Sequence, residues 1–123
     1  MRSQEAARQA YDAFVRGDIQ GLLSLCHPDI EWEYYGAVPW SGRRSGHDGV
    51  RQFFEIIAQK LDFEAFEPGA YIGDDETVAV RGRTAAKAKG TSHRFDNLWV
   101  HFFSVRDGRI SRYEGYDTTP YPS

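Results

Sequence analysis

His101 is the residue best suited to move a proton in this sequence, because an imidazole titrates near neutral pH. It lies between Trp99 and Phe103 in a run of alternating side chains. Such alternation is typical of a strand, so His101 shares one strand face with two aromatic rings. The alternative is structural, since a buried histidine on an apolar strand needs only a hydrogen-bond partner.

Three further polar side chains are candidates to act with His101. Tyr34 and Tyr11 are phenols that could donate a hydrogen bond to a ligand carbonyl, and Asp117 could serve as a general acid or base. Core packing is the alternative for Tyr11, whose helical spacing already explains it, and a surface position is the alternative for Asp117. Together, these residue types would support proton transfer next to a carbonyl group.

Aromatic residues make up 15% of the chain, with eight Phe, seven Tyr and three Trp. So many rings must be absorbed by a core or by the wall of a pocket. We expect the ligand-binding wall to comprise Tyr11, Phe14, Trp32, Trp40, Phe53, Phe54, Trp99, Phe103 and Tyr113. Simple core packing is the alternative for each of them.

The partner of His101 depends on the turn at Arg106-Asp107-Gly108. A three-residue loop would place Tyr113 opposite His101 and Gly115 opposite Trp99, with Tyr113, Gly115 and Asp117 facing inward. A two-residue Asp107-Gly108 turn would instead place Glu114 opposite His101, because a slip of one residue exchanges the faces. We favour the first register, since a small glycine could accommodate the indole of Trp99.

Three helices are predicted to position these side chains, and all begin in the N-terminal half of the chain. Apolar spacing predicts a helix from Ser3 to Arg16, with Ser3 as its N-cap. Asp18 can cap a short second helix that ends at His27-Pro28. Ser45-Gly-His-Asp48 resembles a capping box for a third helix that buries Val50, Phe53, Phe54, Ile57 and Leu61.

Alternating side chains predict five strands. The first begins at Asp29 and reaches Tyr35, and a loop from Gly36 to Gly46 follows it. The other four cover roughly 62–72, 77–89, 93–105 and 109–117. Helices that precede a meander of antiparallel strands indicate an α+β fold, with the helices on one face of the sheet.

The strand from His93 to Val105 is apolar on both faces, because Leu98, Val100 and Phe102 alternate with the inward set. A sheet face open to water usually carries polar residues. We therefore predict that a second copy of the chain covers this outer face, which would make the protein a homodimer.

Composition excludes several classes of function. A chain of 123 residues fits one domain, and a formal charge of -3 does not suggest a nucleic-acid partner. The single cysteine, Cys26, allows no intrachain disulfide, and no apolar run is long enough for a membrane span. His27, Asp29, His47 and Asp48 lack the separated spacing of a metal site. We expect a cytoplasmic protein without metal, cofactor or membrane partner.

The sequence resembles the SnoaL-like family over nearly its whole length. The resemblance rests on the order and spacing of five segments: 10–18 (AYDAFVRGD), 29–33 (DIEWE), 46–50 (GHDGV), 99–110 (WVHFFSVRDGRI) and 116–118 (YDT). This family belongs to a superfamily with nuclear transport factor two and ketosteroid isomerase. The resemblance implies one domain over residues 1–123: a cone of curved, mostly antiparallel sheet with three helices on its concave face, usually dimeric, around a pocket for small apolar or polycyclic ligands.

The resemblance does not fix the activity, because function depends on the residues in the pocket. The two acids of ketosteroid isomerase align with Tyr34 and His101, which argues against that reaction as such. The triad of limonene epoxide hydrolase aligns near Gly82, Thr84 and Gly115 and is also absent. For a polyketide cyclase, His101 and Asp117 are the nearest candidates.

The sequence thus favours a small-molecule pocket protein. The first hypothesis is a cofactor-free acid/base enzyme of the isomerase, cyclase or hydratase type, acting on a small cyclic or polyketide-like carbonyl compound. In it, His101 carries the proton, Tyr34 or Tyr11 polarises the carbonyl and Asp117 assists. The alternative is a module that binds a small apolar ligand without converting it, or that serves only for dimerisation.

Overall fold

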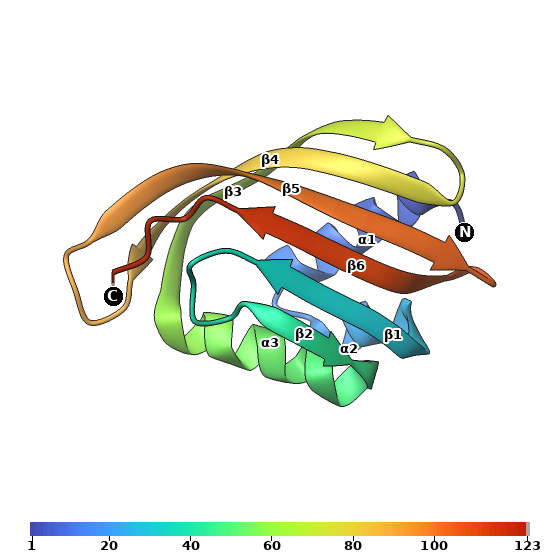
Figure 1. Ribbon diagram of the computed structural model, residues 1–123, viewed down its shortest axis with the longest axis horizontal. Helices are drawn as coiled ribbons and strands as arrows, with labels where there is room; N and C mark the ends of the chain where they lie inside the picture. The colour runs from blue at the N-terminus through green and yellow to red at the C-terminus, as the bar shows by residue number, and fades with distance from the viewer. Residues whose placement is uncertain (123) are drawn as a thin grey trace.

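A curved sheet of six strands forms the body of the molecule, and three helices cover its concave face (Figure 1). The computed structural model describes residues 1–122. Within them, the α+β architecture predicted from the sequence is confirmed, because the helices come early in the chain and the last four strands form an antiparallel meander. The cone shape follows from the bend of these long strands (Figure 1).

The helices are α1 (Ser3–Val15), α2 (Ile19–Ser24) and α3 (Gly46–Lys60). Asp18 caps α2 as predicted, because its carboxylate accepts a hydrogen bond of 2.8 Å from the backbone N–H of Gly21. The predicted cap of α1 is wrong, whereas Ser45 is the N-cap residue of α3 as predicted but lacks the side-chain bond of a capping box. Arg2, not Ser3, is the N-cap of α1, and the Ser3 hydroxyl donates instead to the carbonyl of Asp74. The side chain of Ser45 makes no capping bond to α3.

No helix within residues 1–122 has both the length and the apolar character that crossing a membrane requires. The longest, α3, has 15 residues, and Gln52 and Glu55 are exposed between Val50 and Ile57. Its buried side chains, Val50, Phe53 and Ile57, recur at helical spacing and face the sheet. This amphipathic pattern places Phe53 and Phe54 next to the interior.

The strands follow one another around the cone in the order β2-β1-β6-β5-β4-β3. Their bounds are β1 (Cys26–Tyr35), β2 (Gly42–Ser45), β3 (Leu61–Gly73), β4 (Thr77–Ala88), β5 (Arg94–Arg106) and β6 (Arg109–Asp117). β1 and β6 run parallel, and the remaining neighbours are antiparallel. The short edge strand β2 was predicted as loop, because its sequence Gly-Arg-Arg-Ser has no apolar alternation.

The last hairpin differs from both registers considered for the sequence. Its turn has two residues, Asp107 and Gly108, which both adopt positive φ angles (53° and 76°). A bulge then shifts the ladder between Ser104 and Val105. The favoured pairing is therefore wrong: Gly115, not Tyr113, lies opposite His101.

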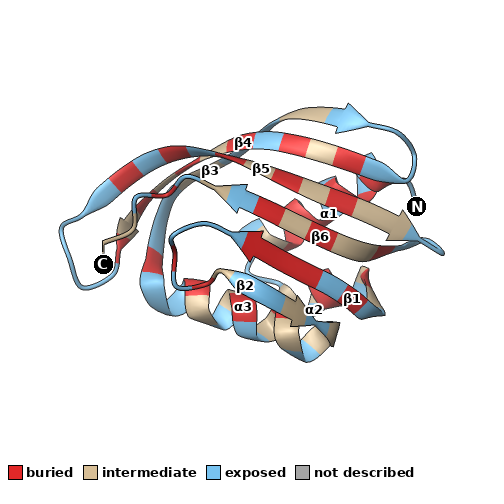
Figure 2. Ribbon diagram, viewed as in Figure 1, coloured by how far each residue is buried: buried red, intermediate tan, exposed pale blue. Residues whose placement is uncertain are grey.

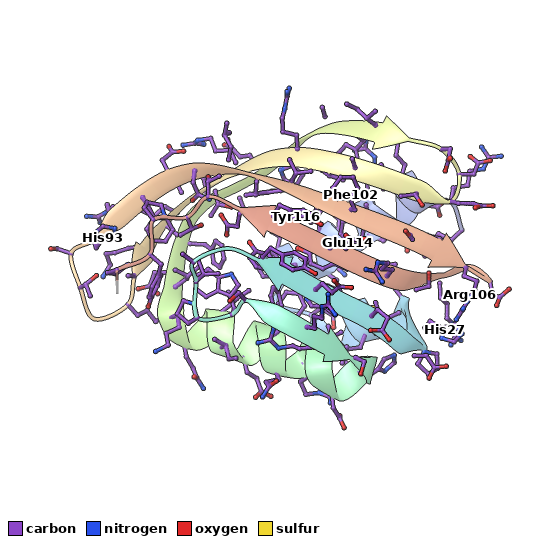
Figure 3. All side chains as sticks on the ribbon, viewed as in Figure 1. His27, His93, Phe102, Arg106, Glu114 and Tyr116 are labelled. Carbon is purple, nitrogen blue, oxygen red and sulfur yellow. The ribbon has the colours of Figure 1, made fainter. Side chains whose placement is uncertain are left out.

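The bulge nevertheless restores the predicted faces. Tyr113 pairs with Phe103 and Asp117 pairs with Trp99, so the side chains of Tyr113 and Asp117 point into the cone, as expected. Glu114 points to the outer face (Figure 3). Burial alternates along β4, β5 and β6, as Figure 2 shows. The one extra residue of the bulge thus keeps the polar and aromatic set of β6 inside the molecule.

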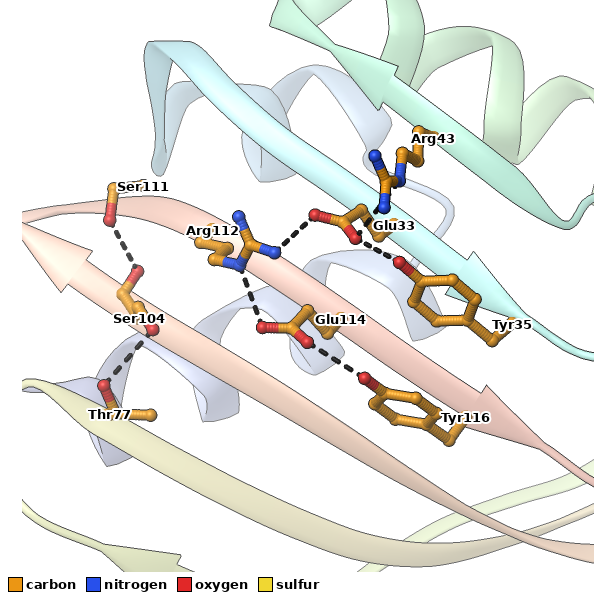
Figure 4. Close-up of polar contacts among 9 residues, drawn as sticks. All are labelled: Glu33, Tyr35, Arg43, Thr77, Ser104, Ser111, Arg112, Glu114 and Tyr116. Atoms are coloured by element: carbon orange, nitrogen blue, oxygen red, sulfur yellow. Dashed lines mark hydrogen bonds and ion pairs between the residues drawn. The ribbon is translucent and has the colours of Figure 1, made fainter.

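The outer face of the sheet carries a polar cluster (Figure 4). Arg112 donates to Glu33 and, at 2.8 Å, to Glu114, while Tyr35 and Tyr116 donate to the same two carboxylates. The prediction of an apolar outer face therefore holds only along β5. There Leu98 is 61% exposed, and Val100 and Phe102 are half-buried.

Candidate functional site

A cavity of about 70 Å³ lies inside the cone, between α1, α3 and the concave face of the sheet. All twelve residues predicted for the site border it. They are the catalytic candidates His101, Asp117 and Tyr34 and the wall candidates Tyr11, Phe14, Trp32, Trp40, Phe53, Phe54, Trp99, Phe103 and Tyr113. The fold thus brings together side chains from α1, α3, β1, β5 and β6.

His101 lies at the centre of this site and is only 5% exposed. Its Nδ1 is joined to the hydroxyl of Tyr11 by a hydrogen bond of 2.8 Å, which connects β5 to α1. Burial lowers the pKa of His101 from its ordinary 6.5 to about 3, because no charged partner compensates the lost hydration of an imidazolium. The ring is therefore neutral at physiological pH.

Nε2 of His101 is the ring atom left for a ligand. Within residues 1–122, the side-chain hydrogen bond of this imidazole is made by Nδ1, to Tyr11. The imidazole is also held in place by stacking on the indole of Trp99, with ring centroids 3.9 Å apart. A fixed ring with one engaged and one free nitrogen is the arrangement that a proton-transferring histidine requires.

Asp117 is the acceptor at the second polar centre. Its Oδ2 accepts from the hydroxyl of Tyr34 at 2.6 Å, and its Oδ1 accepts from the Asn97 side-chain amide at 2.7 Å. The backbone N–H and hydroxyl of Thr119 also donate to Oδ1, at 2.8 and 2.6 Å. Four donors therefore fix this carboxylate, and both Asp117 and Tyr34 border the cavity.

Burial is the main reason why the pKa of Tyr34 is raised well above its ordinary value, and the nearby charge of Asp117 adds to it. Burial likewise raises the pKa of Tyr11 and of Tyr113. All three phenols therefore keep their protons across the physiological range. They are hydrogen-bond donors to a ligand rather than bases.

Tyr113 carries the hydroxyl that remains available. Its ring stacks on Trp32 at 3.9 Å, and its hydroxyl lies 2.8 Å from the point where a Cβ of Gly115 would be. The ring of Tyr34 approaches the same point to 2.5 Å. Gly115 therefore leaves the space into which both tyrosines extend, between Tyr34 and His101.

A buried donor without a partner lies in the same wall. Within residues 1–122, Nε1 of Trp32 makes no hydrogen bond, although Trp32 is 2% exposed. An unpaired buried donor of this kind costs about 1–3 kcal/mol. Trp99 differs, because its Nε1 donates to the Thr84 hydroxyl at 2.7 Å.

The indole of Trp99 lies over Gly82 of β4, not over Gly115 as predicted. A Cβ at Gly82 would lie 2.2 Å from the six-membered ring of this indole. The glycine that accommodates Trp99 is thus on the strand that precedes β5, in direct register with it. The alternation of side chains along one strand does not predict this contact, because the contact joins residues of two neighbouring strands.

Among the site residues that the sequence analysis missed, four hold other site residues in place. Asn97 and Thr119 hold Asp117, Thr84 holds Trp99, and Phe66 stacks on Trp99 with centroids 5.2 Å apart. Asn97 and Thr84 occupy inward positions of strands that were predicted correctly, so their alternation was a usable signal. Thr119 follows the last strand and carried no such signal.

Cys26 is buried, as predicted, and burial raises the pKa of its thiol to about 12. Within residues 1–122, His, Cys, Asp and Glu side chains nowhere gather as a group of three that could hold a metal ion. The titratable side chains that border the cavity are one imidazole, three phenols and one carboxylate: His101, Tyr11, Tyr34, Tyr113 and Asp117.

Comparison with known families identifies the fold. The model of the SnoaL-like domain matches residues 7–113. The chain belongs to the SnoaL-like family. Membership confirms the resemblance stated from the sequence, including the relation to nuclear transport factor two. The matched range contains eleven of the twelve predicted site residues and ends before Asp117. No curated protein matches this SnoaL-like chain in sequence.

Solved structures share the whole fold with this SnoaL-like chain. An NTF2-like protein from Burkholderia xenovorans is 26% identical, with a TM-score of 0.85 over 95% of this chain and 89% of that one. An NTF2-like protein from Burkholderia thailandensis is 23% identical, with a TM-score of 0.88 over 98% and 95%. TerC, co-crystallised with polyporic acid, is 27% identical, with a TM-score of 0.75 over 90% and 87%.

The family and these neighbours agree with a small-molecule-binding protein of the isomerase or cyclase type. The fold, the enclosed aromatic cavity and the polar groups in it are consistent with one another. Within this family, function depends on the residues of the individual pocket.

Proposed function

We propose that this chain catalyses cofactor-free proton transfer next to the carbonyl group of a small cyclic or polyketide-like compound. The observation that carries the proposal is the free Nε2 of His101, in an aromatic cavity where Tyr11 fixes the ring from the other side. A histidine bonded to a side chain and open toward a cavity fits catalysis better than one sealed against backbone.

In the proposed step, the tautomer of His101 that donates Nδ1–H to Tyr11 uses its Nε2 lone pair as the base. The C–H bond beside the carbonyl breaks, an N–H bond forms, and the electron pair moves onto the carbonyl oxygen. The resulting enolate is negatively charged. It stabilises the imidazolium beside it, which offsets the burial that keeps the pKa of His101 low in the empty cavity.

Tyr113 is the proposed donor to the carbonyl oxygen. Of the two phenols that the sequence favoured for this role, Tyr34 already donates to Asp117, and Tyr11 is held at Nδ1 of His101, away from the nitrogen that takes the proton. The Tyr113 hydroxyl lies in the space that Gly115 leaves, beside the ring of Tyr34, and Gly115 pairs with His101 on the neighbouring strand. Asp117 then acts by positioning Tyr34, which borders the same space.

Deuterium exchange measures this reaction directly. We expect the protein in D₂O to accelerate exchange of the α-protons of cyclohexanone and its 4-alkyl derivatives, followed by NMR. The His101→Gln variant should lose about 10²-fold or more of this rate, and Tyr113→Phe about 10-fold or more. Ser104→Ala, on the outer face of β5, is the control that should not change it. Exchange at the buffer rate, or an unchanged rate in His101→Gln, would contradict the proposal.

A non-catalytic ligand-binding module is the second candidate. It is favoured by the low pKa of His101, which makes the imidazole a weak base, and by the absence of the acids that related enzymes carry at Tyr34 and His101. A ligand that co-purifies unchanged with the protein, together with no exchange in the ketone series, would support this candidate.

A further inference from the structure

The interior cavity is too small, as it stands, for the ligand that the proposed function requires. Its volume is about 70 Å³. An apolar cavity of about 150 Å³ holds one benzene molecule, and drug-sized ligands occupy about 300 Å³ or more. A six-membered ring therefore enters only if part of the wall moves.

An outer groove of about 400 Å³ adjoins this cavity. It opens between the end of α1, the start of α2, the C-terminal half of α3 and the start of β3, and Val15 and Ala58 are among the residues that line it alone. The cavity and the groove share six apolar residues: Phe14, Phe54, Ile57, Leu61, Phe63 and Phe66.

The partition between the two spaces consists largely of phenyl rings. The ring of Phe14 lies 5.6 Å from Phe54, 5.5 Å from Phe63 and 5.1 Å from Phe66, centroid to centroid. Phe63 is 40% exposed, and the other three are half-buried. Phe66 also stacks on Trp99, and Phe54 also contacts Trp32, so these two rings are held from the cavity side. The aromatic contacts of Phe14 and Phe63 are with the partition rings, so these two can turn into the groove without breaking a hydrogen bond.

The cavity and the groove differ in the polarity of the side chains that line them. The imidazole, the phenols and Asp117 border the cavity, whereas Glu64 is the one polar side chain among the residues that line the groove. The Glu64 carboxylate is paired with Arg94 at 3.1 Å. The groove thus offers apolar contact without an unpaired charge.

We infer that the cavity and the groove are two halves of one binding site, for an uncharged cyclic carbonyl compound with an apolar substituent remote from the carbonyl. The carbonyl ring displaces the partition and occupies the cavity beside His101 and Tyr113, and the substituent lies in the groove against Phe14 and Phe63. This inference rests on the proposed function for the location of the carbonyl, but it concerns binding and not turnover.

A homologous ligand series tests the inference. Calorimetric titration with cyclohexanone, 4-ethylcyclohexanone and 4-pentylcyclohexanone should show affinity rising about 4-fold for each added CH₂ group, as apolar burial predicts. Equal dissociation constants across the series would overturn the inference, since the substituent would then gain no contact.

Filling the groove gives a second and independent test. Ala58→Phe adds a ring at an exposed position of α3 that lines the groove but not the cavity. It should weaken binding of 4-pentylcyclohexanone at least 10-fold and that of cyclohexanone less than 2-fold. Gln52→Phe, exposed on the same helix outside both spaces, is the matched control. Val15→Phe fills the groove from α1, should Ala58→Phe not fold.

The two proposals fail in different ways. A steep dependence of affinity on chain length without any proton exchange would overturn the proposed function and support the two-part site. Catalysed exchange, with affinities that neither chain length nor Ala58→Phe changes, would overturn the two-part site and support the proposed function.

Discussion

His101 combines two properties that the structure accounts for separately. Its burial among rings removes the hydration that an imidazolium needs, so the neutral form is favoured. Its bond to Tyr11 satisfies one nitrogen and leaves the other for the cavity. Both properties depend on α1 lying over β5, so the chemistry of this residue depends on contact between distant parts of the chain.

From the low pKa of His101 we predict how the free energy of unfolding depends on pH. Between pH 6.5 and about 3, the unfolded chain protonates this residue and the folded chain does not. The free energy of unfolding should therefore fall by about 1.4 kcal/mol for each pH unit below 6.5 through this group. Urea denaturation at several pH values would measure it.

The His101→Gln variant isolates this contribution from that of other titrating groups. Its unfolding free energy should fall less steeply than that of the natural protein between pH 6.5 and 4. Parallel curves for the two proteins would show that His101 titrates normally and is not buried as described.

The sequence predicted which side chains belong to the site better than it predicted their hydrogen-bond partners. Strand and helix periodicity placed His101, Tyr34 and Asp117 on inward faces, and all three border the cavity. Their hydrogen bonds could not be foreseen, because Tyr11 is 90 residues from His101 and Tyr34 is 83 residues from Asp117. Pairing at such separations depends on the packing of whole elements.

At the scale of elements, the hairpin of β5 and β6 shows what periodicity misses. The two-residue turn alone would turn Tyr113 and Asp117 outward, and the bulge after it turns them back. A bulge adds one residue to a strand, and no particular amino-acid type marks its position in the sequence. The sequence therefore predicted the strands and their inward faces, but not the register between them.

Gly82 of β4 shows how tightly neighbouring strands fit. Gly82→Ala would place a methyl group 2.2 Å from the indole of Trp99, so the indole must move from Thr84. We expect a loss of about 1–3 kcal/mol in the free energy of unfolding, measured with urea.

Ala85→Ser is the matched control, because it also adds one atom to β4 but on the outer face. Its free energy of unfolding should stay within about 0.5 kcal/mol of the natural value. Equal effects of the two substitutions would mean that Trp99 does not occupy the space above Gly82.

For the whole molecule, the dimer remains a prediction. The outer face has a narrow apolar stripe along β5, next to the polar cluster of Glu33, Arg112 and Glu114 (Figure 3, Figure 4). Static light scattering at tens of micromolar should give twice the chain mass of 14.0 kDa. A mass of one chain would contradict the prediction.

A charge placed in the stripe tests which face forms the dimer. Leu98→Glu should shift the mass toward that of one chain, because the burial of a charge opposes association. Ile72→Glu, at an exposed position of the edge strand β3, should leave the mass unchanged. A dimer that persists in Leu98→Glu would locate the interface elsewhere.

The overall architecture could be predicted from the order of the elements, with the helices before the antiparallel meander, and from the periodicity of the apolar residues. The number of aromatic residues indicated that some of them line a pocket. Cavity volume did not follow, because it depends on how rings from α1, α3 and β3 pack against one another. The irregular burial along β3, which has two register shifts, also hid the inward position of Phe66.

The central claim is that a cyclic carbonyl compound binds inside the cone, beside His101. Titration of ¹⁵N-histidine-labelled protein with 4-pentylcyclohexanone tests it most directly, because NMR observes each imidazole separately. We predict that the Nε2 signal of His101 shifts to saturation while those of His27, His47 and His93 stay unchanged. Saturable binding that leaves the His101 signal in place would contradict the account.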